Sequence, residues 1–256
     1  MKTILSSIAV AFSMYSRIPV PSKNLDDRGM RYALCFFPLI GAVIGFLIML
    51  WSSISYFFGF GTIVKAAGSC VIPILVSGGI HMDGFLDTVD ALSSHKSREE
   101  KLKILKDTHT GSFAVIYAVV YMILYFAMWT DLSLKQELIL SIGFVLSRAL
   151  SALAVAVFAK AKKSGLLYVF ACEADRKMVV LSSLIYIVIC AAAFFAIDWR
   201  LALLALCASF LAFFIYRVVS YRQFGGITGD LAGFFVCLCE LLAAVFVQIG
   251  GLIWNL

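Results

Sequence analysis

The sequence predicts an all-α fold, in the form of a polytopic integral membrane bundle with about seven transmembrane helices. Of its 256 residues, 62% are apolar, and the mean hydropathy is +1.00. Only 14% of the residues are charged, and these are bunched rather than spread along the chain. Apolar runs of about 20 residues, the length that crosses a roughly 30 Å hydrocarbon core, recur throughout. These observations exclude an ordinary soluble domain.

The apolar runs define seven predicted spans within one membrane-embedded domain covering residues 1–256. We expect residues 1–34 to form a cytoplasmic or interfacial N-terminal segment, because no convincing small-residue cleavage site follows the short apolar stretch at its start. We expect residues 80–111 to form a cytoplasmic loop that carries the active site. The predicted spans are 35–58, 62–79, 112–129, 137–159, 178–197, 200–221 and 231–253.

The distribution of basic residues predicts the orientation in the membrane. If the N-terminus lies inside, the loops on that side hold 17 basic residues and the opposite loops hold only Lys65, Lys135 and Arg200. The positive-inside rule therefore places the N-terminus in the cytoplasm and the C-terminus outside. The net charge of +6 reflects this asymmetry and gives no reason to invoke nucleic acid.

The end of the second span carries the most informative motif, in which three aspartates follow the glycine pair Gly78 and Gly79. Asp83, Asp87 and Asp90 are spaced i, i+4 and i+7, so on a helix they fall within an arc of about 60°. Like charges at this spacing repel each other unless a cation lies between them, and carboxylates with substrate phosphates suit Mg²⁺. The alternative is a solvated acidic helix start, which does not explain the glycines or the third aspartate.

A second glycine pair precedes the last span. The pattern Gly-Gly-Ile-x-x-Asp occurs at 78–83 and again at 225–230. A glycine pair permits tight turns with positive φ, and a turn that opens a helix presents free N–H groups to an anion such as phosphate. The two motifs are predicted on the same side of the membrane, so we expect two half-sites around one substrate.

Other polar residues lie next to these motifs or within the spans. Ser97 and Glu100 have the spacing of a capping box, which predicts a short cytosolic helix over 97–107. Arg148 and Glu240 lie inside predicted spans, where a charge costs roughly 2.5–3.5 kcal/mol and so needs a partner or a polar cavity. Either they form a structural pair, or Glu240 extends a polar pocket away from the cytoplasmic side. His81, two residues before Asp83, is a candidate proton acceptor if its pKa is near neutral.

Together these motifs resemble the cobalamin synthase family, the adenosylcobinamide-GDP ribazoletransferases. The resemblance rests on Gly-Gly-Ile-His-Met-Asp-Gly-Phe-Leu-Asp-Thr-Val-Asp at 78–90, on Lys106, Asp107 and Gly111, and on Gly-Gly-Ile-Thr-Gly-Asp at 225–230 with Glu240. Ser-Arg-Ile-Pro-Val-Pro at 16–21 and Phe-Pro-Leu-Ile-Gly at 37–41 agree as well. The matches run in order from about residue 16 to residue 240.

The resemblance implies a phosphotransferase of the bacterial or archaeal cytoplasmic (inner) membrane, with its site facing the cytoplasm. A hydroxyl of α-ribazole, or of α-ribazole 5′-phosphate, attacks the cobinamide-linked phosphate of adenosylcobinamide-GDP, GMP leaves, and adenosylcobalamin or its 5′-phosphate forms. On this hypothesis His81, Asp83, Asp87 and Asp90 are catalytic, and Asp83, Asp87, Asp90 and Asp230 hold Mg²⁺. Substrate contacts would come from Gly78, Gly79, Lys106, Asp107, Gly111, Arg222, Gly225, Gly226, Thr228, Gly229 and Glu240.

Two other functions remain open at this stage. A magnesium-dependent CDP-alcohol phosphatidyltransferase shares an Asp-Gly-x-x-Asp theme, but Thr88 and Val89 stand where that family has Ala-Arg. A secondary transporter would explain broken helices and intramembrane charges, although transporters place their sites near the bilayer midplane. The partners we expect are the lipid bilayer and the two substrates. The sequence leaves open a homo-oligomer or association with other enzymes of the corrinoid pathway.

Overall fold

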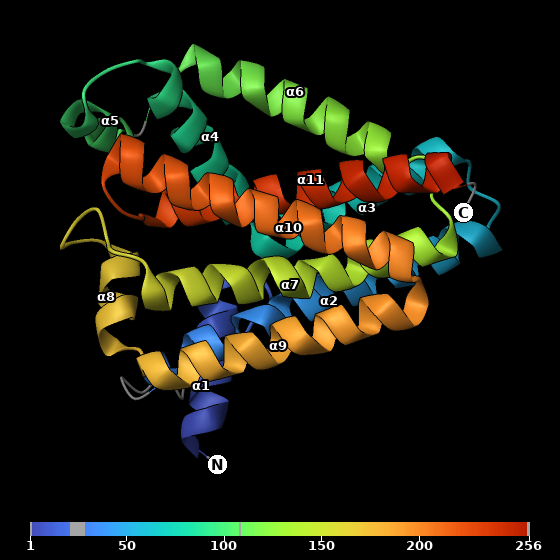
Figure 1. Cartoon of the computed structure of the whole chain (residues 1–256), viewed down its shortest axis with the longest axis horizontal. Coiled ribbons are helices and arrows are strands. Elements are labelled where there is room, and N and C mark those ends of the chain that lie inside the picture. The colour runs from blue at the N-terminus through green and yellow to red at the C-terminus, as the bar shows by residue number, and fades with distance from the viewer. Residues whose placement is uncertain (1, 21–28, 108, 255–256) are drawn as a thin grey trace.

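The computed structural model describes residues 2–20, 29–107 and 109–254, and the named elements of these residues are all helices (Figure 1). Outside the described residues lie Pro21 of the motif at 16–21, Lys23 and Arg28 among the basic residues of the N-terminal segment, and Thr108 of the predicted active-site loop. The helices are α1 (Lys2–Tyr15), α2 (Met30–Phe57), α3 (Thr62–Ser77), α4 (Ile80–Ser93), α5 (Arg98–Ile104), α6 (Ser112–Met128), α7 (Leu134–Val157), α8 (Leu166–Glu173), α9 (Arg176–Ile197), α10 (Trp199–Val219), η3 (Ser220–Phe224) and α11 (Gly229–Trp254).

Each predicted span corresponds to a helix, which confirms the helical membrane fold. Five helical segments of the described chain are long and apolar enough to cross a membrane: α2, α7, α9, α10 with η3, and α11. A sixth span exists if α3 and α4 are counted together across their 94° bend, and α6 is apolar but only 17 residues long. The number of membrane crossings and the orientation of the N-terminus stay predictions.

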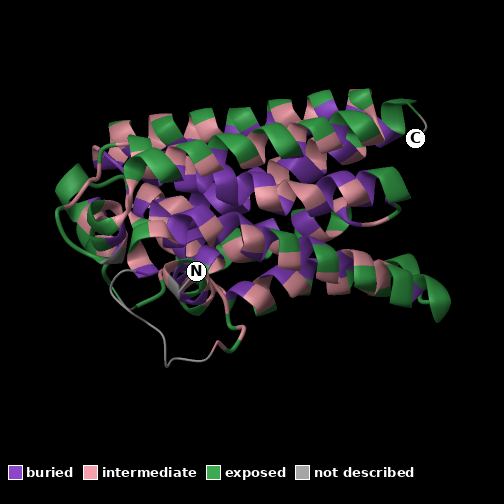
Figure 2. Cartoon of the chain, turned by 90° about the horizontal axis from the view of Figure 1, so that it is seen from below, coloured by how far each residue is buried: buried purple, intermediate pink, exposed green. Residues whose placement is uncertain are grey.

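Helix α7 lies at the centre of the bundle, against α2, α9, α10 and α11. In its most apolar 18-residue window 72% of residues are buried, compared with 17% in α9, which lies at the periphery. Gly41 and Gly45 of α2 face the backbone of α7 at Phe144 and Ser141 so closely that a Cβ atom would collide there. Small residues allow this approach, as is common where membrane helices cross. Buried residues accordingly gather inside the bundle and exposed ones on its outer faces (Figure 2).

The polar connections gather at one end of the bundle, opposite the C-terminus (Figure 1). There the turn after α7 pairs with the segment before α11: the Ala161 N–H donates to the Ile227 carbonyl at 3.0 Å, and the Ile227 N–H donates to the Ala159 carbonyl at 2.8 Å. Helix α5 begins with the predicted capping box, in which Ser97 accepts from the Glu100 N–H. Its Lys101 donates to Gln223 of η3 at 2.6 Å.

The glycine pair Gly78 and Gly79 breaks the chain between α3 and α4. Both residues have positive φ, +66° and +80°, a conformation that favours glycine. Gly78 ends α3 as its left-handed cap, and Gly79 begins α4, which runs at 94° to α3. The predicted tight turn is confirmed. The break directs α4, with its three aspartates, away from the axis of α3.

Candidate active site

Helix α4 separates its polar and apolar residues as the spacing predicted. Asp83 is exposed and Asp87 and Asp90 are half-buried, whereas Phe85 and Thr88 on other faces are buried in the bundle. The ring of Phe85 stacks on Phe234 of α11, with centroids 5.8 Å apart. The apolar face of α4 therefore holds the helix in place and leaves its carboxylates accessible.

Two glycines bring α4 and α11 into backbone contact. A Cβ atom on Gly84 would lie 2.7 Å from the Asp230 carbonyl oxygen, and one on Gly233 would lie 2.9 Å from the His81 carbonyl oxygen. Asp83 precedes the first glycine, and Asp230 lies at the start of α11. This crossing unites the two Gly-Gly-Ile-x-x-Asp motifs, and Asp83 and Asp230 line the same cavity.

The carboxylates of α4 and α11 influence one another electrostatically. Helix α4 lies outside the predicted spans, and the pKa of Asp87 on it is raised to about 6, first by burial and then by the negative charges of Asp83, Asp230 and Asp90. Four carboxylates thus share one region. The repulsion among these four negative charges favours a bound cation.

The donor set fits Mg²⁺ in a site shared with substrate. All four side chains offer carboxylate oxygens, which hard divalent cations prefer. Among the described residues, no three His, Cys, Asp or Glu side chains lie close enough to hold a metal by themselves. Mg²⁺ is usually held by one or two carboxylates, with water and substrate phosphates as further ligands, and this arrangement fits the set.

The second glycine pair has the positive φ angles expected of it. Gly225 has φ +73° and Gly226 has φ +156°. The hydroxyl of Thr228 accepts from the Leu231 N–H at 3.2 Å and donates to the carboxylate of Asp230 at 3.3 Å. The turn is held from behind by the Ala159–Ala161 backbone, which a Cβ on Gly226 would meet. The start of α11 is therefore fixed beside the carboxylates of α4. We call this region, with Asp83, Asp230 and the cavities that they line, the rim of the site.

Basic side chains line a cavity of about 440 Å³ on one side of Asp230. Lys106 and Lys162 both line it, together with Thr228 and Gly229. The ammonium of Lys162 donates to the Leu102 carbonyl at 2.6 Å. Burial, and then the charge of Lys106, lower the pKa of Lys162, while Asp230 acts in the opposite direction. The cavity combines positive charge with a helix start, a combination that suits a phosphate.

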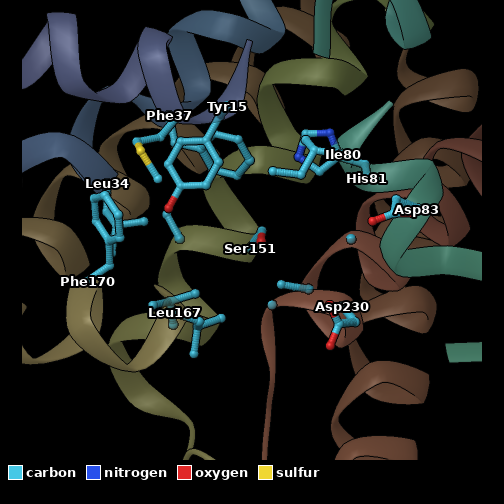
Figure 3. A pocket seen from close by; sticks show the side chains of 16 residues that line it. Tyr15, Leu34, Phe37, Ile80, His81, Asp83, Ser151, Leu167, Phe170 and Asp230 are labelled. Carbon is cyan, nitrogen blue, oxygen red and sulfur yellow. The ribbon is translucent and has the colours of Figure 1, made fainter. Parts of the chain in front are cut away.

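Two further cavities meet at Asp83. One, of about 600 Å³, is lined by Arg17 and by Gly78 and Gly79. The other, of about 270 Å³, is lined mainly by apolar side chains and has Asp83 and Asp230 on one side (Figure 3). The two aspartates thus stand where an open, a basic and an apolar cavity adjoin.

The position of His81 does not favour its expected role as proton acceptor. Its ring is buried beside Phe37, at 5.7 Å between centroids. Burial, and then the charge of Arg148, lower the pKa of His81 to about 3, far from neutrality. Its imidazole Nδ1 has no hydrogen-bond partner among the described residues.

Arg148 and Glu240 form the structural pair that was one of the two alternatives. The Arg148 guanidinium donates to the Glu240 carboxylate at 2.5 Å, to the Ser147 hydroxyl at 3.0 Å and to the Phe144 carbonyl at 3.0 Å. Both charged side chains are buried. They also line a small inner cavity with His81, so Glu240 lies inside the bundle and not at the rim.

Some predicted substrate residues lie farther from the rim. Arg222 on η3 is exposed and lines none of the three rim cavities, and Asp107 pairs with His109 at 2.8 Å on the surface. Gly111, at the start of α6, lies so close to Asp90 that a Cβ atom on it would collide with the Asp90 carboxylate.

Sequence reasoning missed Lys162 as a site residue and counted it only as positive charge, and it noted Arg17 as a positive charge and as part of the motif at 16–21 without giving it a role in the site. It also missed Arg98, whose guanidinium covers Gly225. Their positions depend on how distant segments pack, so no local pattern assigned them to the site.

The chain matches known proteins over nearly its whole length. The family model described as Cobalamin-5-phosphate synthase matches residues 7–248. A protein of Lachnoclostridium phytofermentans named adenosylcobinamide-GDP ribazoletransferase is 48% identical over 96% of this chain and 94% of its own length. Proteins with the same name from Clostridium perfringens strain 13 and Chlorobaculum tepidum are 30% and 29% identical, over 97% and 98% of this chain and 100% and 99% of their own. No solved structure matches the chain significantly.

Proposed function

The chain belongs to the cobalamin-5-phosphate synthase family and is a transferase of the last assembly step of cobalamin, and we propose that its reaction takes place where Asp83 and Asp230 meet. One observation carries the proposal: these two carboxylates adjoin a basic, an apolar and an open cavity. The names of the relatives imply adenosylcobinamide-GDP and ribazole as substrates, and we propose that the acceptor is α-ribazole or its 5′-phosphate. Family membership favours this function over the lipid transferase and the transporter.

In the proposed reaction a hydroxyl oxygen of the ribazole forms a bond to the phosphorus next to cobinamide. The bond from that phosphorus to the bridging oxygen breaks, GMP leaves with that oxygen, and the hydroxyl proton passes to a base. Such displacements depend on positioning and on charge neutralisation more than on a covalent nucleophile. The site supplies both signs of charge that this chemistry needs.

Each group at the rim has a proposed role. One or two of Asp83, Asp87, Asp90 and Asp230 would hold a Mg²⁺ ion together with water and substrate phosphates, and the ion when bound would neutralise the bridging phosphates. Lys106 and Lys162 would bind the phosphate of the leaving GMP, and the Thr228–Gly229 turn would orient it. An aspartate of the cluster, and not the buried His81, would accept the hydroxyl proton, because the carboxylates stand at the rim.

The protein is a membrane protein, and we place its site on the cytoplasmic side of the inner membrane. The basic connections cluster at the same end of the bundle as the rim, and the positive-inside rule assigns that end to the cytoplasm. Both substrates carry polar or charged groups and would reach the rim from the aqueous phase.

The test is GMP release by detergent-solubilised protein given adenosylcobinamide-GDP, α-ribazole and Mg²⁺. Wild type is compared with Asp83→Asn and with Glu99→Gln, which removes one exposed carboxylate of α5 that lines none of the three cavities. Magnesium-dependent release by wild type and Glu99→Gln, with a loss of at least about 100-fold in Asp83→Asn, supports the assignment. Near-normal release by folded Asp83→Asn refutes it.

A further inference from the structure

We propose that the apolar cavity beside Asp83 and Asp230 binds the aromatic base of the ribazole acceptor. The inference rests on the proposed function, since it names the subsite that would hold one of the two substrates. The cavity lies between α1, α2, α4, α7, α8 and the start of α11 (Figure 3).

The cavity has the size and lining of a site for a small aromatic group. Its volume is about 270 Å³, close to the lower end of the range of about 300–1,000 Å³ for small-molecule sites. Tyr15, Phe37 and Phe170 line the side opposite the aspartates (Figure 3). The ring of Tyr15 lies 4.6 Å from that of Phe37 and 6.0 Å from that of Phe170. Planar bases pack favourably on such rings.

The charges around the cavity discriminate among the parts of the substrates. No lysine or arginine is among the described residues that line it, whereas Asp83 and Asp230 stand at its edge and repel phosphate. Asp230 also lines the neighbouring cavity, but there Lys106 and Lys162 offset its charge, so the guanosine phosphate fits that cavity better. The corrin ring is far too large to enter. Three aromatic bases remain: guanine, the adenine of the adenosyl group, and the benzimidazole of ribazole. Guanine and adenine carry amino or carbonyl groups that an apolar lining would leave without partners, whereas benzimidazole is uncharged, mostly apolar and bicyclic, so it fits the cavity best.

The cavity also contains an unused polar group that a base could satisfy. His81 lines it, is only 8% exposed, and its Nδ1 has no partner among the described residues. A buried polar atom without a partner is unfavourable, so a ligand that supplies one is favoured. Nδ1 is shielded as the cavity stands, and a rotation of the His81 ring would let its N–H donate to the free ring nitrogen of the base. With the base in place, the attached ribose would lie toward Asp83 and Asp230, where the phosphate chemistry is proposed.

The first experiment measures direct binding of α-ribazole to Asp83→Asn protein by calorimetry, without Mg²⁺ and without the second substrate. Binding of α-ribazole with at least about tenfold preference over adenosine, which presents a more polar base, supports the proposal. Equal binding of the two nucleosides, or none, overturns it. Because turnover is not measured, this result is independent of whether the carboxylates act as proposed.

The second experiment compares Phe170→Leu with Phe195→Leu, a matched change at an exposed position of α9. We expect Phe170→Leu to raise the KM for α-ribazole at least about tenfold while leaving the KM for adenosylcobinamide-GDP within about twofold, and Phe195→Leu to change neither. Equal changes in both KM values overturn the proposal. A lipid found in the purified protein that α-ribazole fails to displace also overturns it, because the cavity would then hold an acyl chain.

Discussion

Alanine at Gly84 would add one methyl group where α4 crosses α11. The new Cβ would lie 2.7 Å from the Asp230 carbonyl oxygen and 2.9 Å from its Cα atom. Both are backbone atoms, so no side chain can rotate away. The two helices would have to separate by about 0.7 Å before the first contact reaches an ordinary 3.4 Å. Asp83 and Asp87 would then move relative to Asp230.

The size of the effect follows from this displacement. Adding a methyl group to a well-packed contact costs about 1–3 kcal/mol of stability. A misplacement of about 1 Å in a catalytic arrangement can cost about 100-fold in rate. A separation of 0.7 Å therefore predicts a loss of about 10-fold to 100-fold in the rate of GMP release. The loss should exceed any fall in the fraction of folded protein.

The assay is the rate of GMP release, with thermal unfolding in detergent measured on the same preparations. Gly143→Ala is the matched control, because this glycine lies inside α7 and a Cβ there meets nothing within 4 Å. The control should keep its activity and be as stable as wild type or more so, since alanine favours a helix by about 1 kcal/mol over glycine. Full activity and unchanged unfolding in Gly84→Ala would show that the crossing does not set the geometry of the site.

Two further predictions concern charged residues. Arg148→Leu should lower the free energy of unfolding by about 3–5 kcal/mol, and with it the unfolding temperature, because it leaves the carboxylate of Glu240 buried without its partner. The double variant with Glu240→Leu should recover much of that stability. A double variant as unstable as the single one would contradict a pairwise role. Lys106→Gln should raise the KM for adenosylcobinamide-GDP about tenfold and leave the KM for α-ribazole unchanged in steady-state kinetics. The reason is that Lys106 lines the basic cavity and not the apolar one. A change confined to the KM for α-ribazole would reverse this assignment.

Local patterns predicted the elements of this protein well. Apolar runs located the helices, Ser97 and Glu100 form the expected capping box, and the two glycine pairs have positive φ. These features depend on residues close in sequence, so composition and spacing suffice to find them. The count of spans was harder, because α3 has 16 residues and α6 has 17, close to the minimum for crossing a bilayer.

The surroundings of the acidic motif were not predictable in the same way. Lys162 reaches the site because the turn after α7 pairs with the segment before α11, about 65 residues later in the chain. The apolar cavity is built from helices that no short motif connects. Burial of His81 follows from its packing against Phe37. Tertiary packing decided each of these features, and a single sequence does not record it.

The crossing of α4 by α11 has a consequence for the order in which the protein is made. Helix α11 is synthesised after the other named helices, yet it supplies Asp230, the backbone that contacts Gly84, and Glu240, the partner of Arg148. Until α11 inserts, Arg148 lacks the carboxylate of Glu240, and the carboxylates of α4 lack Asp230 opposite them. A nascent or truncated chain that lacks α11 therefore holds an incomplete site, and catalytic competence begins only after α11 has been made and inserted.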